Sequence, residues 1–208
     1  MSFDHIAPVY RWLEYALFGP ALERCRTTFL ALPPEVSQLL AVGDGDGRFL
    51  AAALRAHPSL RAVAIDASAS MQRLAKERCK FAAARVHFIS ADILSDHVAA
   101  QPSQAVATHF FFDCFAEREL RTAISAIAGA APDARYWLIS EFAIPERGPM
   151  RWMAYALTRT LYTFFRKTTG ISGHKLVDYR PLLETQGFHL QQEVFRMGGL
   201  LVGQLWVR

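Results

Sequence analysis

Acidic side chains alternate with glycines in one short stretch of the chain, AVGDGDGRFL at residues 41–50. Its three glycines stand at alternate positions, Gly43, Gly45 and Gly47. The stretch follows the apolar run VSQLL and precedes a helix-like segment, so this loop is expected to present its backbone to a nucleotide-like ligand. The spacing G-x-G-x-G differs from the G-x-G-x-x-G of dinucleotide sites.

The two aspartates of the loop, Asp44 and Asp46, restrict the ligand further. Each would repel a pyrophosphate at about 4 Å by roughly 1 kcal/mol in bulk water and by about 4 kcal/mol at an effective dielectric constant of about 20. A cationic or zwitterionic nucleoside avoids this repulsion, and S-adenosyl-L-methionine, a sulfonium with an amino-acid tail, fits that description. The alternative is that Asp46 only N-caps the helix starting near Gly47 while Asp44 faces solvent.

Two more aspartates follow strand-like runs, Asp66 in LRAVAID and Asp92 in HFISADIL. Asp66 lies 19 residues after Gly47, a distance at which a carboxylate can accept both ribose hydroxyls at the carboxyl edge of a parallel sheet. Asp92 can emerge at the same edge and accept from an adenine amino group. The competing interpretations are a turn or cap aspartate for Asp66 and an Asx turn for Asp92.

The run THFFFDCF places His109 and Asp113 near the same edge, where a transferred methyl group would point. Methyl transfer from a sulfonium requires alignment of donor and nucleophile, exclusion of water and, for a weakly acidic nucleophile, a base. His109 is the candidate base because its ordinary pKa lies near neutral pH, and it is also counted among the cofactor-binding positions. Asp113 could orient a substrate hydroxyl or amine. The alternatives are a packed strand-end histidine and an aspartate that caps the helix-like stretch 116–130.

These residues need a parallel sheet to bring them together. Strand-like runs recur at residues 36–43, 60–66, 85–90, 104–112 and 134–142. Helix-like stretches separate them, and this alternation predicts parallel strands joined by crossover helices. The first 32 residues indicate one or two helices that end at the prolines of LPP. FHLQQEVFRM and LLVGQLWVR flank a glycine pair and predict an antiparallel hairpin at the end.

A further helix is expected after the fifth strand, in RWMAYALTRTLYTFFRKTTG at residues 151–170. Its apolar residues form one helical stripe, Met153, Leu157, Leu161, Phe164 and Phe165. We interpret it as a lid that borders the substrate cleft, with a membrane-surface helix as the alternative. The aromatic content of the lid favours an apolar or aromatic methyl acceptor.

The composition of the chain restricts its domain organisation, its partners and its cellular compartment. The chain has 208 residues, 52% of them hydrophobic, and a formal net charge of +4, which suits a single domain with a proper core. Lys and Arg are scattered, so no nucleic-acid partner is expected. The three cysteines are far apart and lack metal-ligand spacing, so we expect no metal and a reducing, cytoplasmic setting. A homodimer and peripheral membrane contact are kept as further hypotheses.

Four segments, AVGDGDGRFL, AIDASASM, HFISADIL and YWLISEFAIP, resemble the successive motifs of class I S-adenosylmethionine-dependent methyltransferases. The opening FDHIAPVYRWL is similar to that of the quinone-biosynthesis C-methyltransferase branch. The resemblance covers residues 3–142 and the terminal hairpin. It implies a Rossmann-like, doubly wound α/β fold that is built on a seven-stranded sheet with an antiparallel last strand.

The resemblance also implies which residues hold the cofactor. They are Tyr10, Gly43, Asp44, Gly45, Asp66, Ala67, Met71, Asp92 and Ile93. Such families usually carry an acid two residues before the first glycine, where this chain has Ala41, and Arg11 stands where the branch often has Asp. The missing acid leaves open whether Asp44 or Asp46 takes over the contact with the amino-acid tail, and it keeps a binding module without turnover as an alternative.

The expected organisation is one methyltransferase domain, residues 1–208. It divides into an N-terminal helical cap (1–32), a cofactor-binding core (36–142), a lid insertion (143–175) and a C-terminal helix with a hairpin (176–208). A small-molecule methyltransferase is the preferred function. The alternatives are a methyltransferase for nucleic acid or protein, a binding module without turnover and, last, an aminopropyl transferase.

Overall fold

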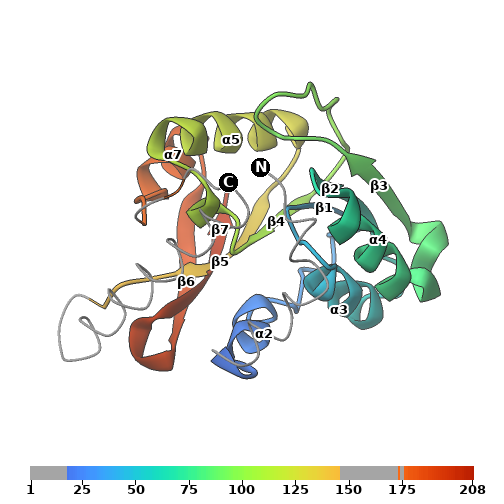
Figure 1. The fold of residues 1–208 in the computed structure, drawn as a ribbon, viewed down its shortest axis with the longest axis horizontal. Coiled ribbons are helices and arrows are strands. Elements are labelled where there is room, and N and C mark those ends of the chain that lie inside the picture. The colour runs from blue at the N-terminus through green and yellow to red at the C-terminus, as the bar shows by residue number, and fades with distance from the viewer. Residues whose placement is uncertain (1–17, 146–172, 174–175) are drawn as a thin grey trace.

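A seven-stranded sheet with helices on both faces forms the centre of the fold (Figure 1). A computed structural model describes residues 18–145, 173 and 176–208. Their strands are β1 (Gln38–Val42), β2 (Arg61–Asp66), β3 (Val86–Ser90), β4 (Ala105–His109), β5 (Tyr136–Phe142), β6 (His189–Arg196) and β7 (Leu201–Val207). Their helices are α2 (Ala21–Arg26), α3 (Arg48–Ala56), α4 (Ala69–Arg78), α5 (Glu117–Ala130) and α7 (Arg180–Thr185). Three 3-10 turns complete them, η1 (Lys80–Arg85), η2 (Phe112–Cys114) and η3 (Met197–Gly199).

The strand order is β3-β2-β1-β4-β5-β7-β6. Strands β1 to β5 are paired in parallel, whereas β7 runs antiparallel to both β5 and β6. The order reverses between β1 and β4, so the carboxyl ends of these two neighbours border the crevice in which open α/β sheets bind ligands.

Apolar side chains of each strand alternate between two layers. In β1, Leu40 and Val42 pack in the layer with α5 and α7, whereas Leu39 packs in the layer with α3. Figure 1 shows α5 and α7 on one side of the sheet and α2, α3 and α4 on the other. Because both faces are covered, the central strands are nearly continuous apolar runs rather than alternating ones.

The predicted fold class is confirmed, including the antiparallel last strand and the terminal hairpin. The fourth strand is shorter than predicted, because β4 ends at His109 and not at residue 112. Phe110 has a φ of 53°, which turns the backbone out of the strand, and η2 begins at Phe112.

Several predictions concern residues outside those described. The lid helix 151–170 and most of the N-terminal cap lie there, although α2 falls within the expected helical segment 1–32. The division of the chain into four parts stays a prediction. In the part of the chain that the structure describes, no helix combines the length and apolar character needed to cross a membrane.

Candidate functional site

The glycine loop connects β1 to α3 at the crevice between β1 and β4. Gly43 has a φ of 66°, and a Cβ placed on it would lie 2.1 Å from Cδ2 of Phe111. Only glycine fits this backbone, since any side chain would both be strained and overlap the Phe111 ring. The loop is thus packed against the segment that follows β4.

A pocket opens over this loop, and most of the predicted cofactor residues line it. They are Gly43, Asp44, Gly45, Asp66, Ala67, Met71, Asp92, Ile93 and His109. Met71 lies in α4, and the others come from the ends of β1, β2, β3 and β4, as the parallel sheet predicts. Tyr10 lies outside the described residues, and Asp113 is not among the residues that line this pocket.

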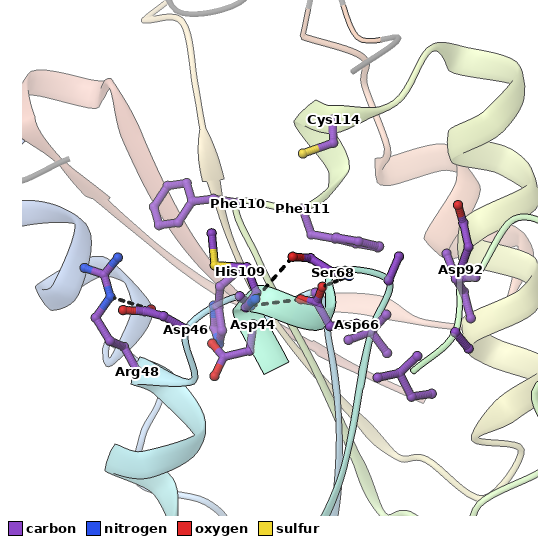
Figure 2. A pocket seen from close by; sticks show the side chains of 18 of the residues that line it. Asp44, Asp46, Arg48, Asp66, Ser68, Asp92, His109, Phe110, Phe111 and Cys114 are labelled. Atoms are coloured by element: carbon purple, nitrogen blue, oxygen red, sulfur yellow. Dashed lines mark hydrogen bonds and ion pairs between the residues drawn. The ribbon is translucent and has the colours of Figure 1, made fainter. Parts of the chain in front are cut away.

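Asp46 has a structural role in the loop. Arg48 donates to its Oδ1 at 2.9 Å, and Arg78 of α4 donates to its Oδ2 at 2.7 Å and to its carbonyl oxygen at 2.8 Å. Figure 2 shows Asp46 turned toward Arg48 and away from Asp66. Both carboxylate oxygens are therefore engaged in ion pairs that tie the loop to the start of α3 and to α4.

Asp44 points into the protein instead of into solvent. Its Oδ2 accepts a 2.9 Å hydrogen bond from the backbone N–H of Leu50, near the start of α3. Its Oδ1 is buried and has no hydrogen-bond partner among the described residues. The interpretation in which Asp46 caps the helix and Asp44 faces solvent is therefore wrong, because Arg78 draws Asp46 away while Asp44 bonds the helix backbone.

The burial of Asp44 predicts a pH dependence of stability. Burial raises the pKa of this carboxyl from its ordinary 3.8 to about 7, and the bond from Leu50 and the charge of Arg26 offset only part of the rise. Between these two pH values the folded state holds a proton that the unfolded state has lost. The stabilisation from that proton is complete below pH about 4 and is lost as the pH rises to about 7.

The side chain of the Asp44→Asn variant cannot ionise. We therefore expect the ligand-free variant to be more stable than wild type, by a difference that grows as the pH rises from about 4 to about 7. The expected growth is on the order of 2 kcal/mol. Urea unfolding of both proteins at pH 4.5, 6, 7 and 8 measures it. Taking the difference between the two proteins cancels the contributions of other groups, including His109. A difference that stays constant across these pH values would contradict the buried state of Asp44.

Asp66 ends β2 and is held in place by the backbone around it. Its Oδ2 accepts from Gly45 N at 3.2 Å, and its Oδ1 accepts from Ser68 N at 2.8 Å. Ser68 in turn caps α4 by accepting from Met71 N at 3.2 Å. The Asp66 carboxylate is thus fixed beside the glycine loop at the mouth of the pocket, where a ligand's hydroxyl groups can reach it.

Asp92 follows β3 and forms a local turn. Its Oδ1 accepts from Leu94 N at 3.0 Å, which is the Asx-turn geometry of the alternative interpretation. The residue nevertheless lines the pocket together with the buried Ile93. A turn aspartate can therefore still border the ligand, because a carboxylate oxygen accepts more than one hydrogen bond.

His109, the last residue of β4, is 5% exposed and packs its ring 4.2 Å from that of Phe49. Burial and then the charge of Arg26 lower the pKa of His109 from 6.5 to about 3, so the imidazole is neutral at pH 7. Its Nδ1 lies 3.0 Å from Oγ of Ser140. Within the described part of the chain its buried Nε2 has no partner. A catalytic role for His109 stays a prediction, and such a low pKa makes it a weak base.

Asp113 lies in η2, close to a second buried carboxyl group, Glu141 of β5. Glu141 accepts at Oε1 from Phe111 N at 2.9 Å and from Phe112 N at 2.8 Å. Burial and then the charge of Asp113 raise the pKa of Glu141 well above its usual range, and burial raises the pKa of Asp113 to about 6. Asp113 does not cap α5, which follows Ala116, so that alternative is wrong. A substrate role for Asp113 stays a prediction.

The pocket also contains residues that the sequence did not single out. Arg26 of α2 lines it, 6% exposed, with its guanidinium 5.0 Å from the ring centre of Phe110. Figure 2 shows Phe110, Phe111 and Cys114 along one side of the pocket, opposite Asp44 and Asp66. One side of the pocket is thus aromatic and apolar, and the other is acidic.

Two comparisons with known proteins agree with this geometry. The family described as "Methyltransferase domain" matches residues 39–131. The solved structure of the mitomycin 7-O-methyltransferase MmcR superposes with a TM-score of 0.72 at 19% identity, over 100% of this chain and 61% of that one. The chain has the class I methyltransferase fold.

Other solved class I methyltransferase structures superpose similarly. An O-methyltransferase family 2 protein from Planctomyces limnophilus, in complex with apigenin, gives a TM-score of 0.68 at 16% identity over 95% of this chain and 61% of that one. Human N-acetylserotonin methyltransferase in complex with SAM gives 0.66 at 16% identity over 99% and 56%. The chain therefore spans about three fifths of the length of these proteins. No curated protein sequence matches it.

Proposed function

We propose that this class I methyltransferase domain transfers a methyl group from S-adenosyl-L-methionine to oxygen or carbon of a small apolar or aromatic molecule. One observation carries the proposal. The pocket over the glycine loop combines acidic groups on one side, Asp44 and Asp66, with an aromatic side formed by Phe110, Phe111 and Phe115. The acidic side suits a cationic nucleoside, and the aromatic side suits an apolar acceptor.

The described residues fit the cofactor. Gly45 leaves room for a ligand beside the loop, since a Cβ there would meet nothing closer than Sδ of Met71 at 3.9 Å, and Asp66 presents a fixed carboxylate at the carboxyl end of β2 for ribose hydroxyls. Asp44 Oδ1 is a buried acceptor on the same pocket. When bound, S-adenosylmethionine would supply a methyl group that its sulfonium already makes electrophilic.

The protein's own contribution would be to position the acceptor and to exclude water. The Phe111 ring packs edge-on against Phe115, with centroids 4.9 Å apart, and covers Gly43. Such a surface binds a flat apolar molecule by contact area rather than by hydrogen bonds. The mitomycin 7-O-methyltransferase and the N-acetylserotonin methyltransferase share this fold and are named for small molecules, which supports the same class of acceptor here.

The low basicity of His109 restricts which acceptors the site can deprotonate. His109 is neutral with a pKa of about 3, so it would remove a proton only from an acceptor that is already acidic. An acidic phenol or an electron-rich carbon suits this site better than an aliphatic alcohol. A binding module without turnover is the second candidate, favoured by the same low pKa of His109.

Asp66→Ala is expected to weaken the binding of S-adenosylmethionine and S-adenosylhomocysteine at least about tenfold, because it removes a charged acceptor of ribose hydroxyls. Calorimetric titration of wild type and variant measures this, with Asp133→Ala as the matched control, since Asp133 is exposed and remote from the pocket. NADH serves as the control ligand. Binding of NADH but of neither sulfur ligand would contradict the proposal.

An acceptor screen then separates the two candidate functions. Quinols and phenols are the first acceptors to test with bound S-adenosylmethionine. Formation of S-adenosylhomocysteine with any of them would support the methyltransferase. Tight cofactor binding without turnover on every acceptor would support the binding module. A homodimer and contact with a membrane surface stay predictions.

A further inference from the structure

Two buried hydrogen-bond acceptors lie at the carboxyl ends of neighbouring strands. Asp44 follows β1, His109 ends β4, and these strands are paired. Asp44 Oδ1 and His109 Nε2 are both buried, both residues line the pocket, and neither atom has a hydrogen-bond partner among the described residues. Figure 2 shows both side chains among the residues that line the pocket. Buried polar atoms are normally paired, so these two atoms call for a donor that the described residues do not supply.

The hydrogen-bond network decides which form His109 takes. Ser140 Oγ donates its single hydrogen to the carbonyl oxygen of Cys25 at 3.0 Å, since a carbonyl can only accept. Ser140 Oγ can then only accept from His109 Nδ1, 3.0 Å away. The proton of the neutral imidazole is therefore on Nδ1, and Nε2 carries a lone pair. His109 presents an acceptor to the pocket and not a donor.

The other charged groups near Asp44 do not supply the missing donor. Arg48 donates to Asp46, which also binds Arg78. Arg26 contributes a favourable charge to Asp44, yet Oδ1 receives no hydrogen bond from it. An external group with several N–H donors and a positive charge would satisfy both acceptors at once.

We infer that Asp44 Oδ1 and His109 Nε2 together bind the α-ammonium group of the cofactor's amino-acid tail. The inference rests on the proposed function and assigns His109 to cofactor recognition rather than to proton removal. It also selects Asp44 from the two loop aspartates that the sequence offers for contact with the amino-acid tail. The alternative of Asp46 is unsuitable, because both of its carboxylate oxygens are already paired with arginines.

The test compares S-adenosylhomocysteine with its analogue that lacks only the α-amino group. We expect wild type to bind the complete ligand about 10- to 100-fold more tightly, the range of a charge-assisted hydrogen bond in a buried site. In Asp44→Asn this preference should disappear. Asn can keep the bond from Leu50 N through its carbonyl oxygen, while its NH2 group replaces the acceptor Oδ1 with a donor.

His109→Phe removes the Nε2 lone pair and keeps a ring against Phe49. We expect it to reduce the preference for the amino group about 3- to 10-fold and to leave the affinity for the deaminated analogue nearly unchanged. Asp133→Asn, an exposed substitution, is the control for Asp44→Asn and should retain the wild-type preference.

Proton release gives a second readout that needs no variant. The carboxyl of Asp44 faces Arg26, Asp46 and Arg48, and its raised pKa means that it is largely protonated at pH 6. Binding an ammonium group would ionise it, so titration of S-adenosylhomocysteine into wild type at pH 6 in buffers of different ionisation enthalpy should show release of up to about one proton. The deaminated analogue should release almost none.

The outcomes of these experiments distinguish failure of the ammonium site from failure of the proposed function. If neither ligand binds wild type, the proposed function itself fails. If both bind but wild type does not prefer the amino group, or if Asp44→Asn and His109→Phe keep the full preference, the ammonium site is wrong while the function stands. If Asp44→Asn does not fold, His109→Phe and the proton release decide the question.

Discussion

Glu141→Ala is expected to lower the free energy of unfolding by about 4 kcal/mol. The Glu141 side chain is 1% exposed and accepts from two backbone N–H groups, those of Phe111 and Phe112. Alanine would leave both N–H groups buried without an acceptor, at about 1–3 kcal/mol each, and would add a cavity. Loss of the buried carboxyl offsets only part of this cost.

Glu141→Gln is the matched control. It keeps an acceptor oxygen for the two N–H groups and removes the ionisable proton, and burial already raises the pKa of Glu141 and so favours its neutral form. We expect its stability to stay within about 1 kcal/mol of wild type. Urea unfolding at pH 7 measures all three proteins. Equal losses in the alanine and glutamine variants would show that the charge, and not the acceptor oxygen, matters.

Hydrogen exchange locates the effect. Glu141 holds the backbone where Phe110 adopts a φ of 53° and where the chain turns from β4 into η2. In Glu141→Ala the amide protons of Phe111 and Phe112 should exchange at least about tenfold faster, while those in the middle of β2 should change only with global stability. Uniform acceleration over the whole sheet would indicate that Glu141 stabilises the fold without holding this turn.

Much of the sheet could be predicted from the sequence because parallel strands carry a local signal. The alternation of apolar runs with helix-like stretches predicted parallel pairing, and parallel pairing alone brings Asp44, Asp66, Asp92 and His109 to one edge. The glycine pair before β7 likewise predicted the hairpin. These inferences need only the order of elements and not the identity of distant partners.

The roles of the two loop aspartates could not be predicted in this way. Asp44 and Asp46 both stand in the loop before α3, and their different roles depend on Arg78, 32 residues after Asp46. Only tertiary packing of α4 against the loop brings that guanidinium to Asp46. A local pattern cannot show which of two equivalent carboxylates a distant cation will bind.

His109 shows the same limit for acid–base chemistry. Its position at the end of β4 was predictable, but its neutral state depends on burial. Its tautomer depends on Ser140, 31 residues from His109, and on Cys25, 115 residues from Ser140. An unperturbed pKa therefore suggested a base where the structure places a weakly basic acceptor. Glu141 did have a signal, a single carboxylate within the apolar run YWLISEF, which sequence reasoning did not use.

Gly47→Ala is expected to lower the free energy of unfolding by about 3 kcal/mol. Gly47 has a φ of 77°, and a Cβ there would lie 2.8 Å from Cβ and 2.9 Å from Cα of Ala75 in α4. The left-handed backbone costs about 1–2 kcal/mol for an alanine, and the overlap adds about 1–3 kcal/mol because a helix backbone has to move. The start of α3 and the helix α4 would be pushed apart where Gly47 meets Ala75.

Gly45→Ala separates these two contributions. Gly45 has a similar φ of 58°, but its Cβ would meet nothing closer than Sδ of Met71 at 3.9 Å, so only the backbone cost of about 1–2 kcal/mol applies. Gly129→Ala, in the last turn of α5 with open space around it, should instead stabilise by about 0.5–1 kcal/mol. Urea unfolding should therefore rank the proteins, from most to least stable, in the order Gly129→Ala, wild type, Gly45→Ala, Gly47→Ala.

Equal stability of Gly45→Ala and Gly47→Ala would mean that α4 moves away from residue 47 at no measurable cost. The close packing of Ala75 on the glycine loop would then not be what requires glycine there.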